Sequence, residues 1–190
     1  MGLDAQEHAI MRALIRNPRM SDNRISALTK VPVRTVSRKR ARLEQRGVLH
    51  YYTGVEMQAG GTGRFNTQHM VIIKFRLGIT RSQIVAEIRS EPNVANVFSE
   101  LIRESFIVET DGHTALVILM EGESDSDVAE NLQGKIIPSL KKNHGKDSIA
   151  DLQTIRVLDV IRRDHNYLPM VNMVNGVIRE GWPSDAIFVE

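Results

Sequence analysis

The chain has 190 residues, of which 42% are hydrophobic and 25% are charged, with a net charge of +2 and a mean hydropathy of −0.22. This length and composition allow one large or two small globular domains, and no apolar run reaches the roughly 18–20 residues that a membrane-spanning helix needs. The absence of cysteine excludes disulfides and thiolate metal sites and is consistent with the reducing cytoplasm. Residues 1–7 have neither a basic nor an apolar segment, so no signal peptide is predicted.

Charge is unevenly distributed along the chain. Residues 1–60 contain 11 Lys and Arg against 5 Asp and Glu, a net charge of +6. Residues 61–190 contain 14 against 18, a net charge of −4. A basic first third and an acidic remainder indicate that only the first third contacts a polyanion.

Three short helices are predicted at the start of the chain. The first covers residues 4–16 and ends before Pro18, because the residue before a proline avoids the helical region. Ser21 is a suitable N-cap for a second helix over residues 21–30. After a turn at Val31-Pro32, a third helix over residues 33–46 ends at Gly47. The apolar face of the first helix consists of Ile10, Met11, Leu14 and Ile15.

A strand and a hinge are predicted next. Residues 48–53 have the composition of a strand, which contributes with the following residues to a wing hairpin. Residues 58–64 contain three glycines, so we expect a flexible hinge there, placed at 58–66. A phosphate-binding loop is a poorer interpretation of these glycines, because the spacing of a P-loop is absent.

The order of the next elements predicts a ferredoxin-like domain over residues 67–163, in the arrangement β-α-β-β-α-β. The pattern Thr80 to Gln83 is a capping box that begins the first helix, and Asp111-Gly112 is a strong hairpin-turn signal. The predicted elements are a strand over 69–77, a helix over 80–90, strand-like residues 94–109, a strand over 113–120, a helix over 124–142 interrupted near Pro138, and a strand over 149–162.

The remaining residues, 164–190, form a C-terminal extension with a second set of apolar side chains. Two interpretations stay open for it: a β-strand arm that reaches another subunit, or a flap that covers its own sheet. Its Trp182 is the only tryptophan of the chain.

The third helix has the strongest functional signal. Arg34, Arg38 and Arg42 are spaced four residues apart, and such a row of like charges destabilises a helix unless an anion neutralises it. DNA phosphates provide that neutralisation, and Arg and Lys also read guanine edges in the major groove. The alternative is a solvated basic face. The residues predicted to contact DNA are Ser21, Arg24, Arg34, Thr35, Ser37, Arg38, Lys39, Arg42 and Tyr52.

Two aspects of this region stay open. Arg40 lies near the inward face marked by Val36 and Leu43, where it either extends its stem along the core or pairs with Glu44. One of the adjacent residues Tyr51 and Tyr52 is expected to pack on the third helix.

Catalytic, metal and cofactor sites are not predicted. The six histidines form no metal-ligand spacing, and no nucleophile elbow or catalytic triad is present. Acidic pairs such as Asp125 and Asp127 are typical of helix caps.

A further pattern consists of the opening Leu3-Asp4 and of Arg42-Leu43-Glu44, followed by Gly47-Val48-Leu49. Through these residues the N-terminal region shows a resemblance to the Lrp/AsnC (leucine-responsive, or feast/famine) family of transcriptional regulators. The resemblance extends over about residues 1–162, because the downstream element order is similar to the ligand-sensing domain of that family.

The resemblance implies homodimers that assemble into larger even-numbered rings, with C-terminal domains that pair through their sheets. It also implies a small-molecule effector, commonly an amino acid, bound between those domains. The effector-binding residues predicted at the hairpin are Glu109, Asp111, Gly112 and His113.

The sequence therefore predicts an α+β protein: a winged helix-turn-helix over residues 1–57, the hinge, the ferredoxin-like domain and the extension. We expect a non-enzymatic, cytoplasmic regulator that binds double-stranded DNA as a homodimer or larger assembly. The alternative is an enzyme on the same scaffold, of the tetrapyrrole decarboxylase type, but such an enzyme has no use for the basic third helix.

Overall fold

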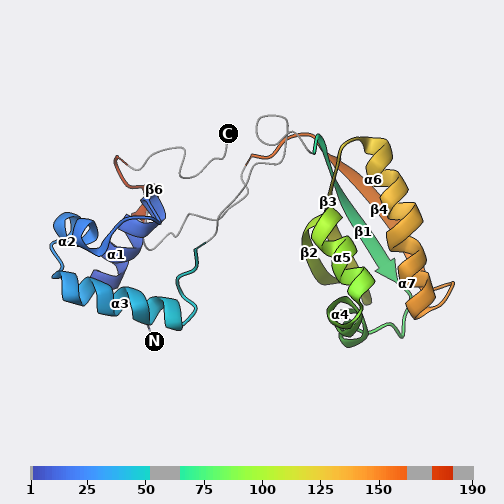
Figure 1. Cartoon of the computed structure of the whole chain (residues 1–190), viewed down its shortest axis with the longest axis horizontal. Helices are drawn as coiled ribbons and strands as arrows, with labels where there is room; N and C mark the ends of the chain where they lie inside the picture. The colour runs from blue at the N-terminus through green and yellow to red at the C-terminus, as the bar shows by residue number, and fades with distance from the viewer. Residues whose placement is uncertain (1, 52–64, 162–172, 182–190) are drawn as a thin grey trace. The chain divides into compact units, whose positions relative to one another are not determined.

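The computed structural model describes residues 2–51, 65–161 and 173–181 (Figure 1). These residues divide into two compact units. One is drawn from Met1–Gly54 and Val160–Glu190, and the other from Val55–Asp159. The predicted wing residues beyond Tyr51, residues 58–64 of the predicted hinge and Trp182 lie outside the described residues.

The first unit begins with the three predicted helices: α1 (Ala5–Arg16), α2 (Asp22–Thr29) and α3 (Val33–Gln45). Helix α1 starts with a capping box, in which the Asp4 side chain accepts from the backbone of Glu7 and the Glu7 side chain accepts from the backbone of Asp4, both at 2.9 Å. Gly47 ends α3 with a φ of +64°, a conformation that glycine adopts without steric cost.

The core of this unit lies where the three helices meet. Its buried residues are Ile10, Ala13, Leu14, Ile25, Val31 and Val36, with Met20 and Leu49 packed against them. A strand is predicted from residue 48, but the described part of it, residues 48–51, does not form a β-strand. Leu49 instead packs on the helical core.

The second unit is a four-stranded antiparallel sheet with helices, in the strand order β2-β3-β1-β4. This order is that of the ferredoxin-like fold, which confirms the predicted fold class. Asp111 and Gly112 turn the β2–β3 hairpin with φ values of +51° and +75°. The elements are β1 (Thr67–Phe75), α4 (Arg81–Ser90), α5 (Pro92–Leu101), β2 (Ile102–Thr110), β3 (His113–Gly122), α6 (Asp125–Asn131), η1 (Leu132–Ile136), α7 (Ile137–His144) and β4 (Ile149–Val157).

The two faces of the sheet have different environments. Alternate residues of β1, namely Val71, Ile73 and Phe75, pack with helix residues such as Ile84 and Leu140 in one buried core. Among the described residues, no helix of that core packs on the opposite face of the sheet. This face exposes four apolar side chains: Met70, Phe106, Val108 and Ile155.

Two element predictions are wrong in this unit. Residues 94–101 belong to α5, because Pro92 suits the first helical turn and Val94, Val97, Phe98 and Leu101 recur at helical spacing. The final strand ends at Val157, so the described residues 158–161 are not part of it. The interruption expected near Pro138 is present as the π-helix η1, which precedes the proline.

The described part of the C-terminal extension is a small hairpin of β5 (Met173–Val174) and β6 (Val177–Ile178). Asn175 and Gly176 turn it with φ values of +52° and +78°. This hairpin belongs to the compact unit that contains the three helices.

Candidate nucleic-acid interface

Helix α3 presents its residues in three directions. Successive residues are rotated by about 100°, so Arg42 lies about 80° around the helix from Arg34, and Lys39 about 140°. Val36 and Leu43 are fully buried, and Lys39 shares their side of the helix with 5% of its surface exposed. The cations of α3 therefore have different environments, although they are close in sequence.

Lys39 and Arg42 pair with carboxylates at the start of α1. Lys39 Nζ donates to Asp4 Oδ2, and Arg42 Nη2 donates to Glu7 Oε1. The side chain of Glu7 is only 2% exposed. The Lys39 ammonium, followed by the backbone N–H of Glu7, lowers the pKa of Asp4. The backbone N–H of Asp4, followed by Arg42, lowers the pKa of Glu7. These ion pairs attach α3 to the capping box of α1.

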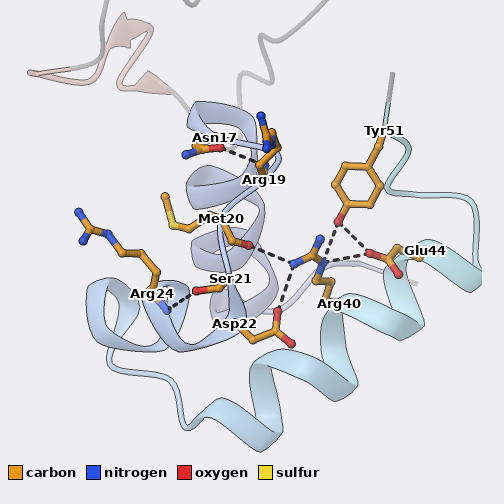
Figure 2. Close-up of polar contacts among 9 residues, drawn as sticks. All are labelled: Asn17, Arg19, Met20, Ser21, Asp22, Arg24, Arg40, Glu44 and Tyr51. Carbon is orange, nitrogen blue, oxygen red and sulfur yellow. Dashed lines mark hydrogen bonds and ion pairs between the residues drawn. The ribbon is translucent and has the colours of Figure 1, made fainter. Parts of the chain in front are cut away.

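Arg40 connects three segments of the unit, as Figure 2 shows. Its Nη1 donates to the Met20 carbonyl and to Asp22 Oδ1, both at 3.2 Å. Its Nε donates to Glu44 Oε1 at 3.0 Å and to Tyr51 Oη at 2.8 Å. Arg40 thus pairs with Glu44, one of the two options open from the sequence, and also binds the turn before α2.

Tyr51 completes this network from the segment after α3. Its hydroxyl donates to Glu44 Oε1 at 2.8 Å, and its ring centroid lies 5.2 Å from the Arg40 guanidinium carbon. Burial of the hydroxyl, with the hydrogen bond to Glu44, raises the pKa of Tyr51 to about 12. The phenol is therefore a protonated donor at neutral pH. Tyr51 is the tyrosine that packs on the third helix, whereas Tyr52 lies outside the described residues.

The remaining face of α3 is open and basic. Arg34, Ser37, Arg38 and Ala41 are all exposed and recur at positions i, i+3, i+4 and i+7. Neither Arg34 nor Arg38 has a hydrogen-bond or ion-pair partner among the described residues, in contrast to Lys39, Arg40 and Arg42. We refer to Arg34, Ser37, Arg38 and Ala41 as the outer face of α3.

The other predicted DNA contacts do not belong to this face. Ser21 is exposed and caps α2, where its Oγ accepts from the Arg24 backbone N–H at 3.3 Å. The Arg24 side chain is exposed, and Thr35 is half-buried. Lys39 lies in the interior and Arg42 is occupied by Glu7, so neither belongs to the outer face of α3. The carboxylates that bind them were not identified from the sequence, although the capping-box pattern of Asp4 and Glu7 is visible there.

The predicted effector residues surround the tip of the β2–β3 hairpin. Asp111 is exposed and pairs with Lys74 at 2.7 Å, and this ion pair lowers its pKa. His113 Nδ1 donates to the Phe75 carbonyl at 2.8 Å. Glu109 and Gly112 are exposed.

A separate apolar cavity of about 330 Å³ lies on the helix side of the sheet. Its polar lining includes the carboxylates of Glu87 and Glu91 and the ammonium of Lys135, which is part of the π-helix η1. Glu87 is buried, pairs with His144 and accepts from Asn143 Nδ2 at 2.6 Å. None of the predicted effector residues lines this cavity.

The described ranges contain no cluster of three His, Asp or Glu side chains that could hold a metal ion. Within the same ranges, every helix is too short or too polar to span a lipid bilayer.

Comparisons with known proteins place both units in a recognised context. Residues 3–49 match the model of the winged helix-turn-helix DNA-binding family. No curated protein sequence matches the chain. The match to this family model confirms the helix-turn-helix predicted from the sequence.

Solved structures with the same fold include transcriptional regulators. Escherichia coli AsnC is 18% identical, with a TM-score of 0.65 over 88% of this chain and 100% of its own. The Neisseria meningitidis transcriptional regulator NMB0573, solved as a complex with L-Met, is 15% identical, with a TM-score of 0.65 over 88% of this chain and 97% of its own. Bacillus subtilis LrpC is 16% identical, with a TM-score of 0.61 over 86% and 100%. At these identities, the resemblance to Lrp/AsnC proteins is confirmed for the fold.

Proposed function

We propose that this chain is a sequence-specific, DNA-binding transcriptional regulator of the Lrp/AsnC type that acts in the cytoplasm as a homodimer or larger assembly. The observation that carries this proposal is the outer face of α3. Its two arginines have no partner among the described residues, while the three neighbouring cations are neutralised within the unit. A surface that keeps exposed arginines beside such a network suits an external polyanion.

The proposed binding mode follows from the geometry of α3. Its 13 residues span about 20 Å, and the outer face includes both arginines in its first half. That half enters the major groove, where Arg34 and Arg38 contact guanine edges or phosphates and Ser37 contacts phosphate or base. In a dimer, two copies of α3 occupy successive major grooves about 34 Å apart on a near-palindromic site.

Self-association is supported by the open face of the sheet. The pairing of the strands places four exposed apolar side chains on the same face of the sheet: Met70, Phe106, Val108 and Ile155. Apolar sheet faces of this kind are typically buried against a second layer. We therefore propose that a second copy of the chain covers this face.

Effector binding is proposed for the second unit. The hairpin residues Glu109, Asp111, Gly112 and His113 remain the candidates from the sequence, and the cavity beside Glu87 is a second candidate because it is apolar and has few polar groups. An effector that favours one assembly or domain arrangement would change DNA affinity by about 1–3 kcal/mol. The L-Met complex of NMB0573 makes amino acids the first effectors to test.

The exposed arginines of α3 favour this function over the tetrapyrrole decarboxylase alternative. The test is fluorescence anisotropy with the promoter DNA of its own gene at several salt concentrations. We expect the double variant Arg34→Ala/Arg38→Ala to lose at least about 10-fold in affinity and to lower the salt slope by about 2. A charge-matched control, the double variant Arg81→Ala/Arg89→Ala at two exposed positions of α4, leaves both unchanged. Weak wild-type binding that depends neither on salt nor on these arginines would refute the proposal.

A further inference from the structure

A hollow of about 740 Å³ lies on the helical unit and is lined by none of the residues of the outer face of α3. It is lined by α1, by α2 and by residues 179–181, which follow β6 in the C-terminal extension. Figure 2 shows the side chains of Met20 and Arg24, which line it, pointing away from Arg40. The hollow is therefore separate from the Arg40 network.

The lining of this hollow is strongly basic. Among the described residues that line it, Arg12 and Arg16 come from α1, Arg24 from α2 and Arg179 from the extension, while Glu180 contributes a carboxylate. Arg12 is half-buried, and neither Arg12 nor Arg179 has a hydrogen-bond or ion-pair partner among the described residues. Burial, followed by the charge of Arg179, lowers the pKa of Arg12. Both guanidinium groups therefore line one hollow, and an anion bound between them would offset their mutual repulsion.

Apolar side chains line the same hollow. Ala9, Ala13, Met20 and Leu28 contribute to it, and Leu28 is exposed to solvent. A site with several arginines and an apolar surface suits a molecule with an anionic group and an organic body. Phosphate is favoured over carboxylate as the anionic group, because its three oxygens and its charge near −2 can accept from several arginines at once.

We propose that this hollow is a binding site for a small phosphorylated molecule, with its phosphate held between Arg12 and Arg179. A free ligand is favoured over a phosphate of bound DNA, because α1 lies between α3 and the β5–β6 hairpin in Figure 1. Since Arg179 belongs to the extension and Arg12 to α1, the bound molecule would hold the extension on the helical unit. The site would thus be separate from the outer face of α3 and from the ferredoxin-like domain.

The test is isothermal titration of the full chain, without DNA, with inorganic phosphate and with adenosine 5′-monophosphate as probes. We expect one saturable site per chain, with a Kd at or below about 1 mM for the monophosphate and weaker binding of inorganic phosphate. Arg12→Gln and Arg179→Gln should each weaken binding at least about 10-fold, whereas Arg89→Gln on α4 should not. Far-ultraviolet circular dichroism verifies that the variants are folded.

The outcomes separate this inference from the proposed function. Absence of saturable binding, or equal binding by the Arg12 and Arg179 variants, would overturn the inference even if the chain binds DNA. If the probes do not bind but each variant lowers the salt slope of DNA binding by about 1, the anion is a DNA phosphate, and the small-molecule site is likewise overturned. Saturable binding that depends on both arginines supports the inference whether or not the chain binds DNA.

Discussion

Replacement of Arg40 tests whether the cations of α3 are divided between folding and DNA contact. Arg40→Ala removes the bonds that connect α3 to Asp22, to the Met20 carbonyl, and to Glu44 and Tyr51. We expect the variant to lose stability of the helical unit while keeping the salt dependence of DNA binding. Arg38→Ala, on the outer face of the same helix, should show the opposite behaviour.

The magnitude follows from the exposure of each partner. The side chains of Arg40 and Asp22 are 24% and 29% exposed, so their ion pair retains most of its value, about 1–2 kcal/mol. The bond to the Met20 carbonyl adds about 1 kcal/mol. Glu44 and Tyr51 are more exposed, and solvent screening reduces their contacts with Arg40 to a few tenths of a kcal/mol together. The sum is about 2–3 kcal/mol, which corresponds to a decrease in Tm of about 10–20 °C for a domain of this size.

The assay compares the two variants in thermal unfolding, followed by far-ultraviolet circular dichroism, and in salt-dependent anisotropy at a temperature where both are folded. Arg40→Ala should lower the Tm and leave the salt slope unchanged, whereas Arg38→Ala should lower the slope by about 1 and leave the Tm unchanged. The reasoning is refuted if Arg40→Ala unfolds at the wild-type temperature, or if it lowers the salt slope as much as Arg38→Ala does.

Three further changes have defined outcomes. The pKa of Tyr51 is raised from 10.0 to about 12, so the protonated phenol stabilises the fold below pH 10 and this contribution disappears as the pH rises through about 12. Tyr51→Phe should therefore flatten the pH–Tm profile between pH 10 and about 12. An unchanged profile in the variant would contradict the assignment. The pKa of Glu7 is lowered from 4.5, so its ionised form stabilises the fold above pH 4.5 and this contribution disappears as the pH falls through the lowered value. Glu7→Gln should lower the Tm at pH 7 by several degrees and make the Tm less sensitive to acid. A variant with the same acid sensitivity as the wild type would argue against the ion pair with Arg42. Phe106 is 55% exposed on the open sheet face, so Phe106→Asp should convert a dimer into a monomer in analytical sedimentation. The control Leu77→Asp, at a residue 75% exposed after β1, should leave the dimer intact. A dimer that tolerates Phe106→Asp does not use this face.

Most elements were predictable because their ends have local chemical signals. Ser21, Thr80 and Ser124 cap the helices they precede, and Asp111-Gly112 turns the hairpin it was predicted to turn. Residues 94–101 were misassigned for a definite reason. Their content of valine, phenylalanine and leucine suggested a strand, whereas the spacing of those residues, and the proline before them, belongs to a helix.

The composition of the outer face of α3 was only partly predictable, because it depends on contacts between residues distant in sequence. Arg34 and Arg38 were recognised from their spacing and lie on the outer face of α3. Lys39 and Arg42 were grouped with them, yet both bind carboxylates 35 residues earlier in the chain. Nothing in the local sequence of α3 indicates that these two cations have internal partners.

Along α3, the residues that form ion pairs within the helical unit are different from the residues proposed to contact DNA, and this separation affects how the DNA target of such a protein can change over evolution. The residues that hold the helix in place, Lys39, Arg40 and Arg42, are distinct from those of its outer face. Under the proposed function, substitutions at positions 34, 37, 38 and 41 would therefore alter the preferred bases without weakening the scaffold that positions them. The same separation makes the outer face suitable for transplantation, since a different set of four side chains could be introduced to redirect the protein to a new operator while its fold is preserved.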